Sequence, residues 1–476
     1  MPIHSSAYDA IVIGSGPNGM AAAIVLAQAG LHVAIYEAKK SIGGGMRSLE
    51  LTLPGFIHDV CSAIHPLAIS SPFFRTLPLE KYGLEWIHPS APLAHPFDDG
   101  TAAVLERSIE ATCQTLRGDG AAYQRLMDPL VGHWEAMAGD LLAPLHFPKH
   151  PFLLARFGLM AMRSANGLSK SLFKDQSARA FFAGLAAHAV MPLDRPLTAA
   201  FGLTLGILGH AAGWPMAQGG SQKIAEALGA FFCSLGGEIY TGVEIESLDQ
   251  LPSARVILCD VSPKTLLQIA KKQLPAKYSS QLAAYRYGPG VFKIDWALNS
   301  PIPWKASACL RAGTLHLGGS AEEITASERQ VWENRPSEKP YVIMAQQSLF
   351  DATRAPAGKH TAWGYCHVPH GSLVDMTERI EAQVERFAPH FKDCILARST
   401  QSTLQLEQYN ANYVGGDING GVQDIYQLFA RPTARIVPYS TPCRGLYICS
   451  ASTPPGGGVH GMCGFHAARA ALKQHF

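Results

Sequence analysis

The sequence predicts an α/β protein in which a Rossmann-like domain carries an inserted domain of mixed α+β structure. Three features indicate the first domain. An apolar run at residues 8–13 leads into a glycine-rich turn and an Ala-rich helical pattern. Apolar runs at residues 238–243 and 255–260 are typical of buried strands, and a last run at residues 446–450 precedes a second glycine-rich turn and a helix. Long segments separate these features, so we expect a discontinuous first domain.

The opening segment has the order of parts that a dinucleotide site needs. Its strand ends at a G-x-G-x-x-G turn, where glycine lets the backbone approach a pyrophosphate closely. Free N–H groups at the start of the next helix attract the negative charge of that group. A second apolar run, residues 32–36, ends on an acid that can accept hydrogen bonds from a ribose 2′-OH. The predicted dinucleotide contacts here are Gly14, Gly16, Pro17, Asn18, Gly19, Glu37 and Ala38.

The segment after Glu37 favours FAD over a nicotinamide cofactor. It contains a glycine cluster and an arginine that a nicotinamide site does not require. This segment resembles the part of glutathione-reductase-type flavoproteins that approaches the FAD diphosphate. A carboxylate at residue 37 also repels a 2′-phosphate, which disfavours NADP. The alternative interpretation of residues 43–45 is an ordinary loop without a role in cofactor binding. We predict contacts to FAD from Gly44, Gly45, Met46 and Arg47.

Composition excludes several classes of protein. Of 476 residues, 47% are hydrophobic and 16% charged, and the net charge of +2 comes without a basic run, so no nucleic-acid partner is expected. The ten cysteines are scattered and form no C-x-x-C pair, so we predict neither a metal site nor a dithiol redox centre. The first seven residues are too short and polar for a secretory signal. The expected location is the cytoplasm, with peripheral contact to a membrane left open.

The segments between the three features predict the second domain. Residues 71–214 have a helical pattern with Pro-rich breaks, and no Asp, Glu, Lys or Arg occurs between Arg195 and Lys223. Because glycines interrupt this uncharged stretch, we expect a helix that lines an apolar cavity rather than a membrane span. Residues 291–398 contain strand-like runs and one helix. We therefore assign residues 1–75, 216–290 and 436–476 to the FAD-binding domain, and residues 76–215 and 291–435 to a substrate-binding lobe.

Longer motifs give the chain a family resemblance. They are the turn at residues 14–19, Glu37, and the segments 43–47, 213–220 (GWPMAQGG), 412–418 (NYVGGDI) and 446–461 (LYICSASTPPGGGVHG). Over essentially its full length the chain resembles the phytoene desaturase-like branch of the FAD-dependent amine-oxidase-type oxidoreductases. The resemblance implies a flavin between the two lobes, under the C-terminal turn. It also implies oxidation or isomerisation of an apolar substrate, such as an isoprenoid or another lipid-like molecule, at C–C or C=C bonds.

Further cofactor contacts follow from the resemblance by position. The backbone at residue 243 is expected to meet the adenine, and the C-terminal turn the pyrimidine edge of the flavin; these further positions are Asp59, Val60, Val243, Gly457, Gly458 and Val459. No cysteine fits the local pattern of the covalently flavinylated amine oxidases, so we predict non-covalent FAD. A second glycine motif suited to NAD(P)H is not found. The expected electron acceptor is therefore O2, a quinone or another diffusible molecule.

Oxidation of a substrate also requires a group that accepts a proton, and histidine is the usual one at neutral pH. His460 directly follows the glycine turn, with a capping or packing role as the alternative. His210 on the uncharged stretch and Tyr365 at a strand end are further catalytic candidates, and core packing explains them as well. The candidate substrate contacts are Trp214, Phe201, His367, Tyr409 and Asn412.

Three functions remain open on the sequence. The favoured one is hydride transfer between an apolar substrate and flavin N5. The second is an amine or amino-acid oxidase of the same fold, which would need an aromatic cage or an arginine clamp, with Arg311, Arg354 and Arg431 as candidates. The third is a non-catalytic protein that FAD stabilises and that acts through partners.

Overall fold

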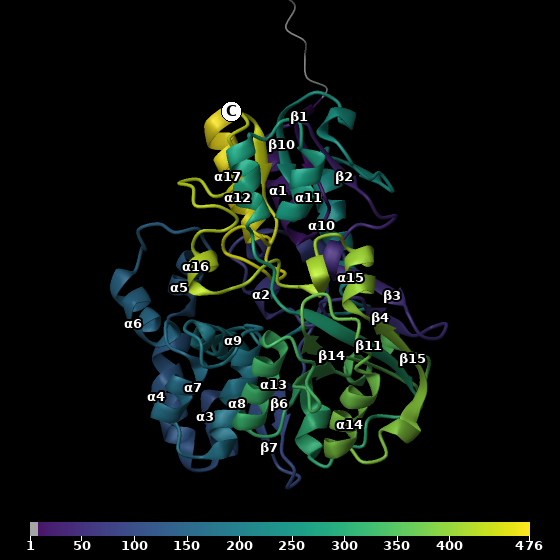
Figure 1. The fold of residues 1–476 in the computed structure, drawn as a ribbon. Coiled ribbons are helices and arrows are strands. Elements are labelled where there is room, and N and C mark those ends of the chain that lie inside the picture. The colour runs from purple at the N-terminus through teal and green to yellow at the C-terminus, as the bar shows by residue number, and fades with distance from the viewer. Residues whose placement is uncertain (1–7) are drawn as a thin grey trace, which may run out of the picture.

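The strands form two large sheets, one in each of two domains (Figure 1). The computed structural model describes residues 8–476, so the prediction about a secretory signal in residues 1–7 lies outside the described range. The first sheet is parallel throughout, in the order β16-β10-β1-β2-β9. Its strands are β1 (Tyr8–Ile13), β2 (Val33–Glu37), β9 (Glu238–Thr241), β10 (Ala254–Cys259) and β16 (Leu446–Ile448). All of them lie inside the three segments assigned to the FAD-binding domain.

Helices cover both faces of this sheet, which explains why its strands read as continuous apolar runs. On one face, Val12 and Leu258 pack with α1 (Pro17–Gln28), α10 (Gln222–Ser234) and α17 (Met462–His475). On the other face, Ile13 and Cys259 pack with α11 (Pro263–Ile269) and α12 (Ala276–Ala283). Successive side chains of a strand point to opposite faces, so β1, β10 and β16 supply both cores, whereas β2 and β9 supply the first one.

The second sheet has the order β15-β11-β14-β13-β12-β6-β7 and is antiparallel except between β12 and β6. Its strands are β6 (Ala91–Pro96), β7 (Ala102–Leu105), β11 (Gly290–Leu298), β12 (Ala312–Leu317), β13 (Val342–Ala345), β14 (His360–Val368) and β15 (Ile395–Gln401). The helical prediction for residues 71–214 was wrong at β6 and β7. Every residue of β6 is buried, so the alternation that marks a half-exposed strand is absent from its sequence.

A layer of helices covers one face of the second sheet and α14 (Thr377–Phe387) packs on the other. The layer contains α3 (Ile109–Thr115), α4 (Gly120–Val131), α5 (Trp134–Leu141), α6 (Pro151–Ala161), α7 (Ala165–Leu172), α8 (Gln176–Ala187), α9 (Thr198–Ala211) and α13 (Ala321–Trp332). The uncharged stretch forms α9, only 14 residues long. Across residues 8–476, no helix combines the length and apolar character that a membrane crossing requires.

Short elements join the two domains. They are β3 (Ser48–Glu50), β4 (Ile57–Asp59), β5 (Trp86–Ile87), β8 (Met216–Ala217), α2 (Pro66–Ile69), α15 (Thr403–Tyr409) and α16 (Ile425–Leu428). Strand β4 pairs with β3 and also packs against β14 of the second sheet. The chain thus passes between the domains next to the dinucleotide turn, and this crossing determines where a site between them can form.

The crossing of α1 and α17 supplies a test of the first domain. A Cβ on Gly464 of α17 would lie 1.8 Å from the carbonyl oxygen of Asn18, so Gly464→Ala forces the two helices apart. We expect it to lower the free energy of unfolding by about 1–3 kcal/mol in urea denaturation. Gly158→Ala in α6, where an added Cβ meets nothing within 4 Å, is the control and should be neutral or stabilising. Equal losses in both variants would contradict the packing.

Candidate functional site

A cavity of about 490 Å³ lies where the two domains meet. Its walls come from the carboxyl ends of the first sheet, from the helical layer and from β12, β13 and β14 of the second sheet. Ligands of parallel α/β sheets bind at the carboxyl ends of the strands. All five strands of the first sheet contribute their following residues: 14–18 after β1, 37–39 after β2, 243–245 after β9, 260–262 after β10 and 450–452 after β16.

The glycines of the first turn leave room that side chains would fill. A Cβ on Gly16 would lie 2.7 Å from Oδ2 of Asp260, and one on Gly44 would lie 2.9 Å from the Cα of Gly16. A Cβ on Gly45 would lie 2.4 Å from the hydroxyl oxygen of Tyr413. These positions line the cavity, as do Gly14, Pro17, Asn18 and Ala38. The space beside these glycines therefore fits an extended group that approaches the backbone closely, as a diphosphate does.

Glu37 is buried at this end of the cavity and its carboxylate is already oriented. Ser15 donates to Oε2 from its backbone N–H at 3.0 Å and from its hydroxyl at 2.5 Å. The backbone N–H of Lys39 donates to Oε1 at 2.8 Å, and the guanidinium of Arg47 lies 3.0 Å from the same oxygen. Arg47 is held between Glu37 and the ring of Tyr409, 5.6 Å from its centroid. Each oxygen thus has two protein neighbours, and a ribose hydroxyl would replace the Ser15 hydroxyl as a donor to Oε2.

Asp260, at the end of β10, is a site residue that the sequence analysis did not single out. Its Oδ2 accepts a hydrogen bond of 2.8 Å from the backbone N–H of Gly19 in the first turn of α1. Burial and the nearby charge of Glu37 raise the pKa of its carboxyl group to about 7. The helix start that would hold a diphosphate therefore carries an acid that is partly protonated at neutral pH. An acid directly after a buried strand was the available signal.

The other end of the cavity is apolar and aromatic. Trp214, Trp363 and Tyr365 line it, with the Trp363 and Tyr365 rings 5.2 Å apart and nearly perpendicular. The aliphatic walls are Ile64, Leu67, Leu205 and Ile343. No Asp, Glu, Lys or Arg of the described chain lines this end. Sequence analysis predicted Trp214 and Tyr365 here but missed Trp363, because β14 is buried except at the half-buried His360 and Tyr365 and gives no sign of which face meets a cavity.

Two histidines that sequence analysis missed line the cavity, His188 and also His65, which lies between Ile64 and Leu67. Nε2 of His188 lies 2.9 Å from Nε2 of His316, so the two rings share one proton. Burial lowers the pKa of His188 to about 3 and that of His316 well below its ordinary value. Behind them, Nδ1 of the buried His367 lies 2.9 Å from the carboxylate of Glu328. His367 was predicted as a substrate contact, but it does not line the cavity.

Comparisons with known proteins agree with this geometry. The model of the NAD(P)-binding Rossmann-like domain matches residues 12–77. A Mus musculus protein, pyridine nucleotide-disulfide oxidoreductase domain-containing protein 2, is 26% identical over 98% of this chain and 93% of its own length. A phytoene desaturase of Cercospora nicotianae is 26% identical over 79% of this chain and 63% of its own length. The chain is similar to these two proteins over most of its length.

A solved structure shares the fold of this chain. An oxidoreductase from Methanosarcina mazei superposes with a TM-score of 0.66 at 16% identity, over 98% of this chain and 99% of that one. Both domains are therefore shared, together with their arrangement. The predicted α/β class, with a Rossmann-like domain, is confirmed.

Two of the three predicted catalytic residues lie outside the cavity. Nδ1 of His460 accepts a hydrogen bond of 3.0 Å from the backbone N–H of Met462, and Nε2 therefore donates to the Gly456 carbonyl, 3.2 Å away. Burial lowers the pKa of His460 to about 4, so this neutral ring ties the C-terminal turn together. His210 of α9 lies 2.8 Å from the hydroxyl of Tyr123 inside the helical layer. The packing alternatives stated for both histidines are the ones that the structure shows.

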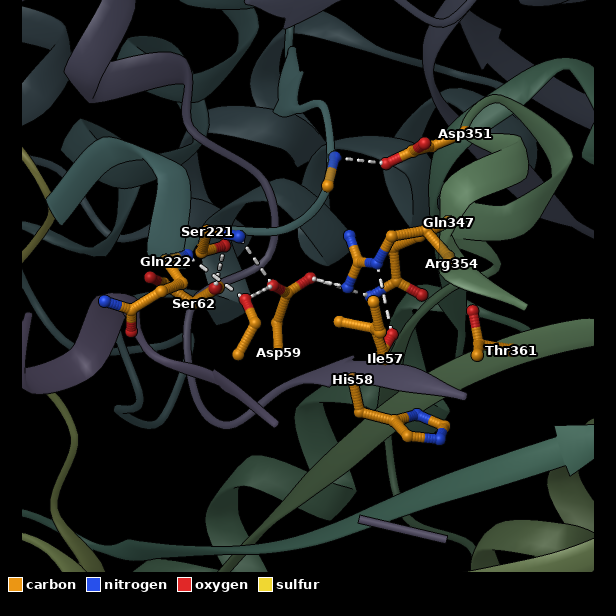
Figure 2. Close-up of polar contacts among 12 residues, drawn as sticks. Ile57, His58, Asp59, Ser62, Ser221, Gln222, Gln347, Asp351, Arg354 and Thr361 are labelled. Carbon is orange, nitrogen blue, oxygen red and sulfur yellow. Dashed lines mark hydrogen bonds and ion pairs between the residues drawn. The ribbon is translucent and has the colours of Figure 1, made fainter. Parts of the chain in front are cut away.

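Asp59 and Val60 do not line the cavity either. Asp59 belongs to a buried polar cluster between the domains (Figure 2). Oδ2 of Asp59 accepts a hydrogen bond of 2.7 Å from Arg354, and Oδ1 accepts one of 2.8 Å from the backbone N–H of Ser221. Arg354 also donates to the Ile57 carbonyl at 3.1 Å. The charges around Asp59 lower the pKa of its carboxyl group despite full burial. The carboxylate is thus saturated by protein groups, and Arg354 is no substrate clamp.

The remaining predicted positions divide between the cavity wall and the core. Val243 lines the cavity, but its N–H donates to the Glu37 carbonyl at 2.9 Å, so only its carbonyl is free for an adenine. Gly458, Val459, Tyr409 and Asn412 line the cavity as well. The positions that do not line it are Gly19, Met46, Phe201 and Gly457. Gly457 meets residue 419 closely, and the side chain of Met46 is in the core.

The ion pair between Asp59 and Arg354 supplies a stability prediction. Arg354→Met leaves a buried carboxylate without its partner and should lower the free energy of unfolding by about 3–5 kcal/mol in urea denaturation. The double variant Asp59→Asn/Arg354→Met should recover much of this loss. Because the folded-state pKa of Asp59 is lowered, its contribution is present above the ordinary carboxyl pKa and is lost as the pH falls. A double variant as unstable as the single one would argue against the pair.

A second prediction concerns Asp260 and the affinity for a dinucleotide. Its raised pKa means that the acid gains its charge as the pH rises through about 7, next to the position of a bound diphosphate. Binding of FAD to the apoprotein should therefore weaken above that pH, and Asp260→Asn should remove the pH dependence and bind about tenfold more tightly at high pH. Titration calorimetry across a pH series measures both effects. Asp249→Asn, an exposed acid on residues 248–250, is the control.

Proposed function

We propose that this protein is a non-covalent FAD-dependent oxidoreductase that acts on an apolar, lipid-like substrate. One observation carries the proposal: a single cavity runs from the dinucleotide turn and Glu37 to an uncharged aromatic pocket in the second domain. The first end suits the adenosine diphosphate half of a dinucleotide, and the second suits a hydrocarbon. An enzyme that oxidises a hydrocarbon needs both groups in contact with each other.

The order of the strand ends supports FAD. A dinucleotide that starts with its ribose at Glu37, after β2, and its diphosphate on the turn after β1 continues past β10 toward residues 450–452 and 458–459. There it enters the region between the two domains, next to Leu67. A nicotinamide dinucleotide is the alternative that the spectrum below distinguishes.

The charge behind this part of the wall favours an electron-rich ring. Arg431 is fully buried and donates to the Gly420 carbonyl at 2.9 Å and to the hydroxyl of Tyr285 at 2.8 Å. Its Nε and Nη1 have no hydrogen-bond partner, and no carboxylate among the described residues forms an ion pair with it. Gly420 and Ser452 separate this guanidinium from the cavity by one layer of backbone. A fixed positive charge in such surroundings stabilises negative charge that develops nearby.

When bound, a flavin supplies a two-electron acceptor for a hydride. The chain supplies the rest. The aromatic walls at Trp214, Trp363 and Tyr365 bind the hydrocarbon and exclude water from it. His188 lines this end of the cavity and is uncharged at neutral pH, and its Nε2 lies 2.9 Å from Nε2 of His316, so this pair is the proposed place for a proton released by the substrate.

The structure offers little to an amine or amino-acid oxidase. Arg311 pairs with Glu106, 2.6 Å away on the surface, Arg354 pairs with Asp59, and Arg431 lies behind the wall. None of the three lines the cavity in the described chain, so a substrate carboxylate finds no clamp.

The positions of the cysteines support non-covalent attachment. Of the ten, all within the described residues, Cys61 is the one that lines the cavity. Burial raises the pKa of its thiol, so the reactive thiolate is scarce at neutral pH. With no glycine motif for a second nucleotide, O2 or a quinone is the proposed electron acceptor.

The absorption spectrum of the purified protein tests this proposal. We expect flavin bands that remain with the supernatant when denatured protein is removed, and full bleaching by dithionite under anaerobic conditions. Rapid recolouring in air would identify O2 as the acceptor, and slow recolouring would favour a quinone. Gly16→Val should abolish FAD binding, whereas Gly118→Ala, where an added Cβ meets nothing within 4 Å, should keep it. A protein that binds NAD(P)H but no flavin would overturn the proposal.

A further inference from the structure

Helix α6 and the loop before it expose large apolar side chains to solvent. The exposed fractions are 73% for Leu145, 87% for Phe147, 91% for Phe152 and 77% for Leu159. These residues lie within 15 positions of the chain. Figure 1 shows α6 at the outer edge of the helical layer. We call these four residues the α6 surface.

Within the segment that carries the α6 surface, the charged side chains all have one sign, and the neighbouring Asp140 is buried against His146 and the backbone of Lys149. Residues 141–174 contain no Asp or Glu, and their five exposed cations are Lys149, Arg156, Arg163, Lys170 and Lys174. None of the five forms an ion pair with a residue of the described chain. An apolar surface for another protein would not need this asymmetry, whereas a negatively charged layer of lipid headgroups attracts it.

The spacing of the exposed residues follows the helix. Phe152, Arg156 and Leu159 are four and three positions apart and therefore share one face of α6. Phe157 and Ala161 point inward and are buried in the core of the helical layer. An apolar stripe that also carries long cationic side chains is the pattern of a helix that lies in the plane of a membrane surface, since such side chains reach back to the headgroups.

We propose that the α6 surface docks on the surface of an anionic lipid bilayer and inserts its apolar side chains among the headgroups. Helix α6 packs on α9, and Leu205 of α9 lines the cavity. Docking therefore places the apolar end of the cavity one helix away from the hydrocarbon of the bilayer. For the lipid-like substrate proposed above, this is a short path from the membrane, although the docking itself does not depend on that proposal.

Flotation with lipid vesicles tests the docking without substrate or flavin reduction. The unmodified protein should float with vesicles of equimolar phosphatidylcholine and phosphatidylglycerol, bind less to phosphatidylcholine alone, and detach as salt is raised. Phe152→Ser/Leu159→Ser should weaken binding about tenfold or more. The control is Leu373→Ser/Val374→Ser, which removes two exposed apolar side chains (68% and 41% exposed) elsewhere and should bind like the unmodified protein.

Two further measurements keep the test decisive. Phe152→Trp should show a blue shift of its added emission when anionic vesicles are mixed in, and Arg156→Gln/Arg163→Gln should lose the preference for anionic lipid.

Absence of vesicle binding, or equal binding by both double serine variants, would overturn the proposal. A dimer in solution that Phe152→Ser/Leu159→Ser dissociates would instead identify a second copy of the chain as the occupant. A flavin-free protein that still floats would separate this proposal from the one on function.

Discussion

The buried ion pair between Asp59 and Arg354 is the interaction on which the site depends, because it joins the two domains directly behind the cavity. Asp59 belongs to the crossing strand β4 and Arg354 to the second domain. The same carboxylate also caps the backbone at Ser221, where α10 begins. A charge pair in such surroundings is costly to separate. The dinucleotide turn and the aromatic pocket are thereby held at one relative position.

The first domain prepares its end of the cavity with charges that already have partners. Glu37 is oriented by Ser15, Lys39 and Arg47, so a ribose meets a carboxylate that does not have to reorganise. Asp260 is the opposite case, since it occupies the helix start that an anionic diphosphate needs. Its burial keeps it partly protonated, which limits the repulsion.

The second domain contributes an apolar cavity wall that excludes water, and among the described residues it adds no charged side chain to that wall. Its pocket is lined by tryptophan, tyrosine and aliphatic side chains, and the titratable group best placed for proton transfer is an uncharged histidine, His188, backed by His316. At the far side of α9, the helical layer exposes apolar side chains at α6 among unpaired cations. The cavity and the α6 surface are the two apolar regions from which the lipid-like substrate and the membrane docking are proposed.

The sequence by itself determined the Rossmann-like start, Glu37, the discontinuous first domain and the glycine turn near Gly458, because each depends on residues that are adjacent in the chain or on strands that are apolar throughout. It did not identify His188, Trp363 or Asp260 as site residues, and it misplaced His460, His210 and Asp59. Asp260, His188 and Asp59 acquire their roles from partners more than a hundred positions away, which are Gly19, His316 and Arg354. Only the tertiary structure decides which buried polar groups face a cavity and which pair with one another. The physical reason is that a buried polar group without a partner costs free energy, so most of these groups are paired inside the protein.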